Sequence, residues 1–247
     1  MATRIYAINL DRSTDRWHAL SQQGKEHHLE LVRVPGIDGT QIPPTNRVDF
    51  DELAFRRNNG RTILPGEYGC YRSHLKALAA FLESGEPLGI IVEDDIQLQP
   101  DLVDRVEAAF NALAGADVIK LFNHRVVWFK RSVRTALGDE IGRAAHGPLG
   151  SAACYAVTRA GAAKLSTALL QMEYPWDIAL ERGWANKTAV YASKQNLTTV
   201  RRQGSTIASR SVYKGTKFPW WRRLGTYARR TAETLRRINF ALQARHH

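Results

Sequence analysis

The chain of 247 residues contains few cysteines and no long apolar segment. Its two cysteines, Cys70 and Cys154, exclude a disulfide framework and the paired spacing of a structural zinc site. No apolar run approaches the roughly 20 residues that a membrane-spanning helix needs. The first ten residues lack the apolar core and the cleavage site of a secretory signal. We therefore expect a protein of a reducing, cytoplasmic compartment.

Acidic residues are almost absent from the last fifth of the chain. Residues 1–200 hold 23 Lys and Arg against 23 Asp and Glu, whereas residues 201–247 hold 12 against one, Glu233. The formal net charge of +11 therefore arises in the tail. This asymmetry predicts a neutral catalytic or binding domain over residues 1–212 and an appended basic amphipathic segment over residues 213–247.

The apolar residues alternate between short strand-like runs and longer runs with helical spacing. Strands are expected at residues 3–9, 29–34, 88–92, 117–122, 126–133, 152–157 and 187–191, and helices at residues 13–20, 67–83, 102–113 and 160–170. Residues 40–65 contain three prolines and read as a loop or insertion. This alternation predicts an α/β layer fold with a mostly parallel central sheet.

An acidic triplet follows the most apolar of the expected strands. Residues 88–92 end directly in Glu93, Asp94 and Asp95. In open α/β sheets the carboxyl ends of the strands are where ligands bind. Adjacent carboxylates repel one another unless a cation compensates them, and Mg²⁺ or Mn²⁺ is the usual partner. The triplet therefore predicts a metal site for a phosphorylated ligand, and the alternative is a solvated acidic turn before a helix.

The tail has the pattern of an amphipathic helix. Its apolar or weakly polar residues recur every three or four positions: Trp220, Leu224, Tyr227, Thr231, Leu235, Ile238 and Leu242. Arginine pairs recur every seven residues, at 222–223, 229–230 and 236–237. This pattern predicts that residues 219–242 lie on an anionic membrane surface. The alternatives are an apolar stripe packed on the body and, less favoured, a nucleic-acid contact.

Several short motifs occur together with the acidic triplet. They are residues 8–12 (INLDR), 15–16 (DR), 36–39 (GIDG), 66–70 (GEYGC), 73–74 (SH), Gly150 ahead of Tyr155, 176–177 (WD) and 203–207 (QGSTI). In this order and spacing the chain resembles glycosyltransferase family 25 over roughly residues 3–210. The resemblance implies a GT-A-like fold, a UDP-sugar donor, transfer with inversion at the anomeric carbon, and a metal held by the acidic triplet.

The resemblance also implies roles for individual side chains. Glu93 and Asp95 are expected to contact the metal, Mn²⁺ or Mg²⁺, because residues two apart on a strand end face the same side. Asp94 is expected to contact the donor sugar or ribose. The remaining donor-binding candidates are Asn9 and Leu10 near the nucleotide base, Arg12 and Arg16 at the diphosphate, Asp38 at the ribose or base, and Ser73 and His74 as donor contacts or supports of the metal site.

These donor-site roles have structural alternatives. Arg12 and Arg16 would equally suit the exposed start of a helix. Asp38 precedes a glycine and would suit a turn. His74 would also suit a buried structural histidine.

Inverting transfer needs a carboxylate that accepts the proton of the acceptor hydroxyl. Asp177 is our candidate for this base, and Trp176 is expected to stack on a sugar ring. The alternatives are a helix-capping role for Asp177, or Glu173 or Glu181 as the base.

The sequence thus predicts a metal-dependent, inverting UDP-sugar glycosyltransferase, with galactose favoured as the sugar. Its expected acceptor is a lipopolysaccharide, a lipooligosaccharide or a lipid-linked glycan at the cytoplasmic membrane face. Two other functions remain open at this stage. One is a metal-dependent nucleotidyltransferase or phosphohydrolase with a similar acidic strand end, and the other is a non-catalytic membrane-binding adaptor.

Overall fold

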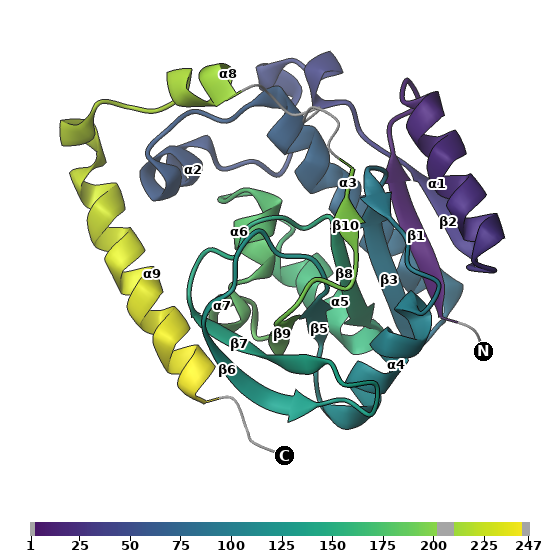
Figure 1. The fold of residues 1–247 in the computed structure, drawn as a ribbon. Helices are drawn as coiled ribbons and strands as arrows, with labels where there is room; N and C mark the ends of the chain where they lie inside the picture. Colours follow the sequence, from purple (N-terminus) through teal and green to yellow (C-terminus); the bar gives the residue numbers. More distant parts are fainter. Residues whose placement is uncertain (1–2, 202–209, 244–247) are drawn as a thin grey trace.

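The computed structural model describes residues 3–201 and 210–243, and Figure 1 shows its arrangement. Eight strands form the main sheet in the order β2-β1-β3-β8-β5-β9-β7-β6. Their bounds are β1 Arg4–Asn9, β2 Leu31–Pro35, β3 Leu88–Glu93, β5 Val118–Lys120, β6 Val127–Arg134, β7 Glu140–His146, β8 Cys154–Thr158 and β9 Val190–Ser193. A separate ribbon pairs β4 (Ile96–Gln97) with β10 (Thr199–Val200).

Strand direction confirms the predicted α/β fold with a mostly parallel sheet. β1 is parallel to both β2 and β3, and β9 is parallel to β5. β3 and β5 both pair antiparallel with β8, so they share one direction. β7 pairs antiparallel with β9 and β6. Only β8 and β7 therefore run against the other strands of this sheet.

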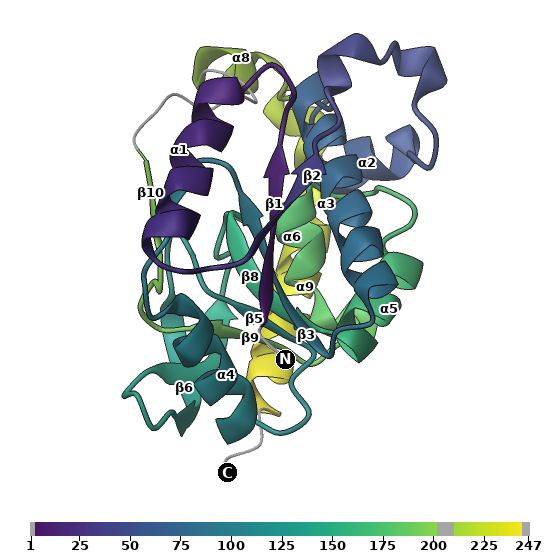
Figure 2. The ribbon, with the colours of Figure 1, turned by 90° about the vertical axis from the view of Figure 1, so that its right-hand side faces the viewer.

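Helices cover both faces of the sheet. Their bounds are α1 Thr14–Glu26, α2 Glu52–Asn59, α3 Pro65–Ser84, α4 Leu102–Ala112, α5 Arg159–Ala168, α6 Trp176–Leu180, α7 Gly183–Asn186, α8 Arg210–Gly215 and α9 Leu224–Leu242, with 3-10 turns η1 Gly39–Gln41, η2 Pro44–Asn46 and η3 Trp220–Arg223. Figure 2 shows α1 and α4 on one side of the sheet and α3 and α5 on the other.

Alternate residues of β1 serve the two cores. Ile5 and Ala7 belong to the core that includes residues of α1 and α4, whereas Tyr6 and Ile8 belong to the core beneath α3 and α5. Successive side chains of a strand point to opposite faces, so a strand covered on both sides is apolar throughout. The same reasoning explains why β3 reads as a continuous apolar run.

The expected loop at residues 40–65 is wrong in part, because it contains α2, η1 and η2. α2 is short and lacks a long apolar stripe, and its ends are set by local chemistry. The Asp51 carboxylate accepts the backbone N–H of Ala54 at 2.8 Å, and Gly60 ends the helix with a φ of 68°. Strand β7 was also missed, since its sequence EIGRAAH has few β-branched residues.

Helix α9 lies along one edge of the body (Figure 1) and contacts β7, α2 and α7. The Thr226 hydroxyl donates to the backbone carbonyl of Arg57 at 2.9 Å, and Arg182 pairs with Glu233 at 2.7 Å. The predicted apolar stripe faces outward instead, since Leu224 and Leu235 are 60% and 62% exposed. The alternative that this stripe packs on the body is therefore wrong. Among the described residues no helix is both long and apolar enough to cross a membrane.

Candidate active site

A pocket lies at the carboxyl ends of β1 and β3, between the starts of α1 and α3 and the turn η1. It is lined by Ile8, Leu10, Arg12, Ser13, Arg16, Ile37, Asp38, Gly39, Thr40, Gly66, Cys70, Ser73, His74, Glu93 and Asp94. Most of the predicted donor-site residues are brought together here. Asn9 lies next to the pocket, and Asp95 and Asp177 are not among its lining residues.

Asp94 is held by a cation and an amide from the first strand and helix. The Arg16 guanidinium lies 3.1 Å from one Asp94 carboxylate oxygen, and the Asn9 side-chain amide donates to the other at 2.7 Å. Asn9 also accepts from the Arg33 guanidinium at 3.0 Å. The end of β1 is thus joined to the turn after β3, and this turn carries two of the three acids.

Asp38 has the turn-forming role considered for it, and it also contacts a cation. Its carboxylate accepts the backbone N–H of Thr40 at 3.0 Å, which caps η1, and it forms an ion pair with Arg12. The Arg12 side chain is 50% exposed at the pocket rim. An exposed guanidinium can exchange its partner for a phosphate at small cost, since exposed ion pairs are weak.

Glu93 is the last residue of β3, and Asp94 and Asp95 form a turn before β4. The prediction that Glu93 and Asp95 face the same side assumed that the strand continues to Asp95. Because the chain turns immediately after Glu93, strand alternation does not establish this orientation. Burial, together with the charge of Glu93, raises the pKa of Asp95 to about 6. Among the described residues, Oδ1 of Asp95 is buried without a hydrogen-bond partner. Crowded carboxylates with an unsatisfied oxygen fit a hard divalent cation.

Ser73 ties α3 to the chain that follows β2. Its hydroxyl donates to the Gly69 carbonyl at 2.7 Å and accepts the backbone N–H of Ile37 at 2.7 Å. These two contacts hold the helix against the glycine-containing turn that closes the pocket.

His74 is fully buried in an aromatic setting. Its ring stacks on Trp176 with centroids 5.0 Å apart and planes 5° from parallel. The predicted stacking of Trp176 on a sugar ring is therefore wrong, because this indole is 2% exposed and covers His74. Sequence alone could not distinguish an indole facing a ligand from one facing the core.

Asp177 lies in the first turn of α6, and Pro175 occupies the N-cap position. The capping alternative is therefore wrong, because the helix begins at Trp176, two residues earlier than a cap at Asp177 requires. Burial raises the pKa of Asp177, and the charge of Glu181 adds to this effect. A carboxyl group with a raised pKa is a stronger proton acceptor, as a general base requires.

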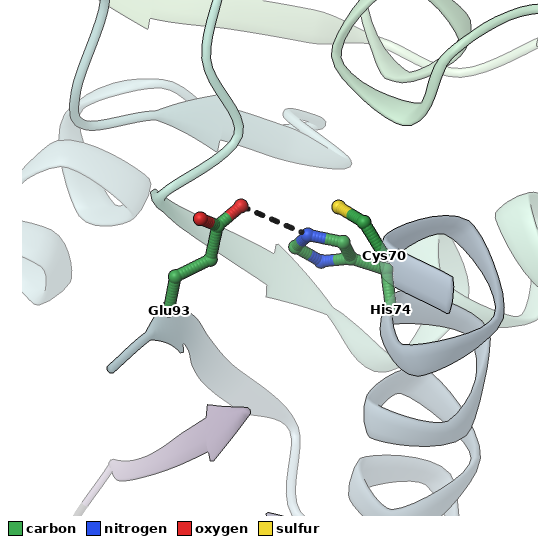
Figure 3. A group of neighbouring side chains, drawn as sticks. All are labelled: Cys70, His74 and Glu93. Carbon is green, nitrogen blue, oxygen red and sulfur yellow. Dashed lines mark ion pairs between the residues drawn. The ribbon is translucent and has the colours of Figure 1, made fainter. Parts of the chain in front are cut away.

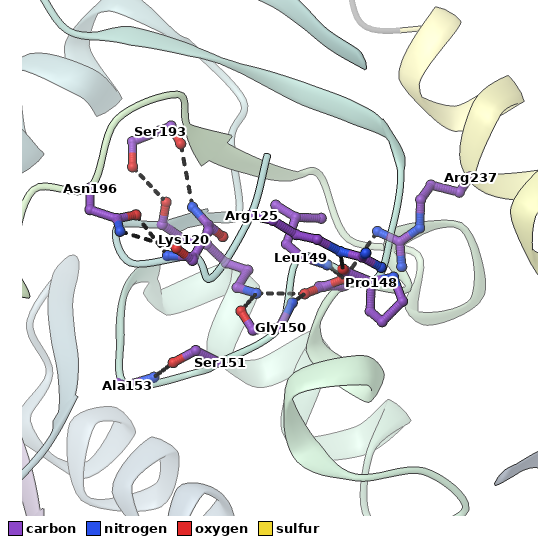
Figure 4. Close-up of polar contacts among 12 residues, drawn as sticks. Lys120, Arg125, Pro148, Leu149, Gly150, Ser151, Ala153, Ser193, Asn196 and Arg237 are labelled. Atoms are coloured by element: carbon purple, nitrogen blue, oxygen red, sulfur yellow. Dashed lines mark hydrogen bonds and ion pairs between the residues drawn. The ribbon is translucent and has the colours of Figure 1, made fainter. Parts of the chain in front are cut away.

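Glu181 belongs to a buried polar network, and Figure 4 labels four of the residues that contact it, Lys120, Leu149, Gly150 and Arg237. It pairs with Lys120 at 2.6 Å and with Arg237 of α9 at 3.0 Å, and it accepts the backbone N–H groups of Leu149 and Gly150. The charges of Lys120 and Arg237 outweigh its burial and lower the pKa of Glu181. Such an engaged carboxylate is poorly suited to accept a proton. Its place in the network identifies it as a structural anchor.

Sequence reasoning overlooked Cys70 as part of the site. Cys70 and His74 stand four residues apart on α3, so they share one helical face toward the end of β3. The spacing was visible in the sequence, but the third member, Glu93, is distant along the chain and only the fold brings it near.

Together these features define an α/β protein with a pocket, lined by both carboxylates and arginines, at the carboxyl edge of its sheet. The sequence model of "Glycosyltransferase family 25 (LPS biosynthesis protein)" matches residues 2–180. The chain therefore belongs to glycosyltransferase family 25.

Curated relatives carry the same family name. A "Glycosyltransferase 25 family member" of Anopheles gambiae is 27% identical over 119 residues, which are 46% of this chain and 19% of the relative. Another, of Drosophila pseudoobscura pseudoobscura, is 27% identical over 103 residues, or 39% of this chain and 16% of the relative. The chain thus spans less than a fifth of the length of these two relatives.

A solved structure described as a glycosyltransferase involved in the glycosylation of the major capsid of PBCV-1 is also similar. It is 8% identical, the alignment covers 87% of this chain and 99% of that chain, and the TM-score is 0.37.

The sequence motif QGSTI at residues 203–207 lies outside the described residues.

Proposed function

We propose that the protein is an inverting glycosyltransferase that transfers a hexose, galactose favoured, from a UDP-sugar to a lipopolysaccharide, lipooligosaccharide or lipid-linked glycan. The observation that carries this proposal is the pocket itself. It gathers Glu93, Asp94, Arg12 and Arg16 at the carboxyl edge of β1 and β3 in a chain of glycosyltransferase family 25. Carboxylates beside arginines suit a ligand that is itself a cation bound to a diphosphate.

Donor binding is assigned to the first strand, the acidic turn and η1. Asn9 and Leu10 are placed near the nucleotide base, Arg12 and Arg16 near the diphosphate, and Asp38 near the ribose. Glu93 and Asp95 would hold Mn²⁺ or Mg²⁺, which neutralises charge on the leaving diphosphate when it is bound. The two arginines would stabilise the same developing charge.

Acceptor activation is assigned to Asp177. Its burial and raised pKa support this role, because proton transfer from a sugar hydroxyl needs a base that does not lose it at once to solvent. Trp176, which directly precedes Asp177 in the chain, stacks on His74, and this contact holds the first residue of α6 against α3.

The acceptor is assigned to the membrane because of the tail. Outward-facing apolar side chains of η3 and α9 include Trp220, Trp221, Leu224, Leu235 and Leu242, all at least 59% exposed. Arg222, Arg229 and Arg236 are exposed beside them. Apolar and cationic groups on one outward surface suit an anionic bilayer, which would bring the enzyme to a lipid-linked acceptor at the cytoplasmic face.

The experiment is a release assay with a panel of UDP-sugars, with and without Mn²⁺. A glycosyltransferase releases UDP and gains thermal stability from its own donor sugar. A nucleotidyltransferase or phosphohydrolase instead releases monophosphate or pyrophosphate, and an adaptor neither binds UDP with Mn²⁺ nor releases it. Asp95→Asn should abolish Mn²⁺-dependent UDP binding, whereas Asp104→Asn at an exposed position of α4 should not.

A further inference from the structure

Three metal-ligating side chains of different kinds meet at the inner wall of the pocket. The Cys70 thiol, an imidazole nitrogen of His74 and a carboxylate oxygen of Glu93 all lie within 4.8 Å of one another. Figure 3 shows the cysteine and histidine on α3 and the glutamate at the end of β3, with their side chains directed toward one another. The separation of the three atoms is short enough for a single ion to contact all of them.

The imidazole is held with one nitrogen directed at this cluster. Trp176 stacks on the ring, and Nδ1 of His74 lies 3.3 Å from the Tyr155 hydroxyl. Nε2 lies 3.5 Å from the Glu93 carboxylate and has no hydrogen-bond partner among the residues that the structure describes. The histidine side chain is 1% exposed. A histidine whose second nitrogen contacts a polar group, leaving the first for an ion, is the usual arrangement of a metal ligand.

We infer that Cys70, His74 and Glu93 form a site for a thiophilic divalent transition-metal ion such as Zn²⁺ or Co²⁺. A thiolate, an imidazole and a carboxylate match the ligands that Zn²⁺ accepts, whereas Mn²⁺ and Mg²⁺ favour oxygen alone. All three residues line the pocket, so a fourth coordination position would be open to a ligand from solution. This site differs from the oxygen site of Glu93 and Asp95, with which it shares Glu93.

Charges around the thiol support a cation at this place. Burial raises the pKa of Cys70, and the carboxylates of Glu93, Asp177, Glu67 and Asp95 raise it further. The same negative field that disfavours an isolated thiolate attracts a divalent ion. On binding, the sulfur–hydrogen bond is replaced by a sulfur–metal bond and the proton leaves to solvent, so metal affinity should fall as the pH is lowered.

The test is a titration of the full chain, freed of metal by a chelator, with Co²⁺. We expect a sulfur-to-cobalt charge-transfer band in the near ultraviolet, with competition by Zn²⁺. Cys70→Ser should remove the band, while Cys154→Ala, the other cysteine, should keep it. Asp95→Asn should also keep it, because Asp95 belongs only to the oxygen site.

A wild-type chain without the band, or a band that persists in Cys70→Ser, overturns the inference. His74→Gln should lose the band while Co²⁺ binding by the oxygen site is kept, and circular dichroism establishes that this variant is folded. If it is not folded, His74→Asn takes its place, because His74 belongs only to the thiol-containing site. These readouts need no sugar donor, so failure here is distinguishable from failure of the UDP-release assay.

Discussion

The acidic side chains in and around the pocket differ in whether a nearby cation compensates their negative charge. This difference indicates which of them would bind a cation from solution. Asp94 has Arg16, Asp38 has Arg12, and Glu181 has two buried cations. Asp95 instead keeps a buried oxygen without a hydrogen-bond partner among the described residues. A carboxylate left uncompensated by the fold is the one that most needs a partner from solution.

The sequence predicted which residues line the pocket better than it predicted which side chains those residues contact. The acidic triplet and the arginines after β1 were recognisable because they directly follow apolar runs, and all but Asp95 line one pocket. The partner of Trp176 was not predictable, because stacking on His74 depends on how α6 packs against α3.

Asp95 should make the metal-free protein less stable near neutral pH. Its pKa is raised to about 6 in the folded chain, so the folded state binds this proton more tightly than the unfolded state does. Stability from this group therefore increases as the pH falls from about 7 toward about 4. We expect Asp95→Asn to unfold at higher urea near neutral pH, with a gain of roughly 1–3 kcal/mol.

The measurement is urea unfolding in the presence of a chelator at several pH values. The gain of Asp95→Asn should shrink toward zero below about pH 3, where wild-type Asp95 is protonated in both states. Asp104→Asn, an exposed control, should show neither effect. A gain that does not depend on pH would contradict this account of Asp95.

Asp177→Asn should impair chemistry more than binding. Loss of a general base typically lowers turnover by roughly 10²–10⁴-fold, while donor contacts are assigned to other residues. We expect kcat to fall by this amount and the affinity for UDP with Mn²⁺ to stay within about twofold of wild type. Steady-state kinetics and calorimetry measure the two quantities.

Glu173→Gln is the matched control, since Glu173 is the remaining alternative base and is half-buried near Asn58. Near-normal turnover in Asp177→Asn combined with a large loss in Glu173→Gln would transfer the role to Glu173.

Among the elements, α3 does most to shape the pocket, because it supplies Cys70, Ser73 and His74. Its length and apolar spacing made it predictable, with ends at Pro65 and Ser84 close to those expected. α2 and α6 were not predictable, since short helices are set by caps and by packing rather than by a long apolar stripe. The residues of β8 also do not indicate that this strand runs antiparallel to its neighbours β3 and β5.

Two glycine-to-alanine substitutions should act in opposite directions. At Gly69 of α3 an added Cβ would lie 2.4 Å from the carbonyl oxygen of Ile37 and 2.5 Å from the amide nitrogen of Gly39, both backbone atoms. We expect Gly69→Ala to cost about 3 kcal/mol or more and to weaken UDP binding, because α3 must move away from η1.

Gly225 near the start of α9 offers the contrast. The nearest atom to its added Cβ is the end of the flexible Arg229 side chain at 3.7 Å. Gly225→Ala should therefore stabilise by up to about 1 kcal/mol through helix propensity. Thermal unfolding of both variants measures the difference, and equal effects would show that the close approach of α3 to η1 is unimportant.

Across the whole molecule, α9 faces the body with Thr226, Glu233, Arg237 and Phe240, and it faces outward with its apolar stripe, beside which exposed arginines lie. The sequence predicted the helix and its two sides, but not which side faces the body. That choice follows from buried partners: Arg237 reaches Glu181, and Arg143 donates to the Phe240 carbonyl at 2.8 Å. A hydrophobic-stripe rule cannot anticipate an interface in which paired charges and one aromatic side chain face the body.

Arg237 should therefore contribute to global stability while its neighbour Arg236 should not. Arg237 is 9% exposed and faces Glu181, whereas the Arg236 side chain is 63% exposed. Removing one partner from a buried ion pair typically costs about 3–5 kcal/mol, although Lys120 would still compensate part of the Glu181 charge. We expect Arg237→Met to cost about 2–4 kcal/mol and Arg236→Met to be near neutral, as measured by urea unfolding.

The last prediction concerns membrane binding by the outward side of α9. Leu224 and Leu235 are 60% and 62% exposed, so replacing both by serine should lower stability by no more than about 1 kcal/mol, through helix propensity. Each buried leucine contributes roughly 1–2 kcal/mol to membrane partitioning. Leu224→Ser with Leu235→Ser should therefore reduce sedimentation with anionic vesicles by at least about tenfold.

Point variants are a sharper test than truncation near Val212, because truncation also removes Arg237 and its buried partner contact. Leu137→Ser, at a leucine that is 56% exposed between β6 and β7, is the matched control and should bind vesicles like wild type. Wild-type binding should weaken on neutral vesicles and at high salt, since exposed arginines interact through screened charges. Undiminished binding by the double variant would exclude the outer side of α9 as the membrane contact, because the only change is the loss of its apolar groups.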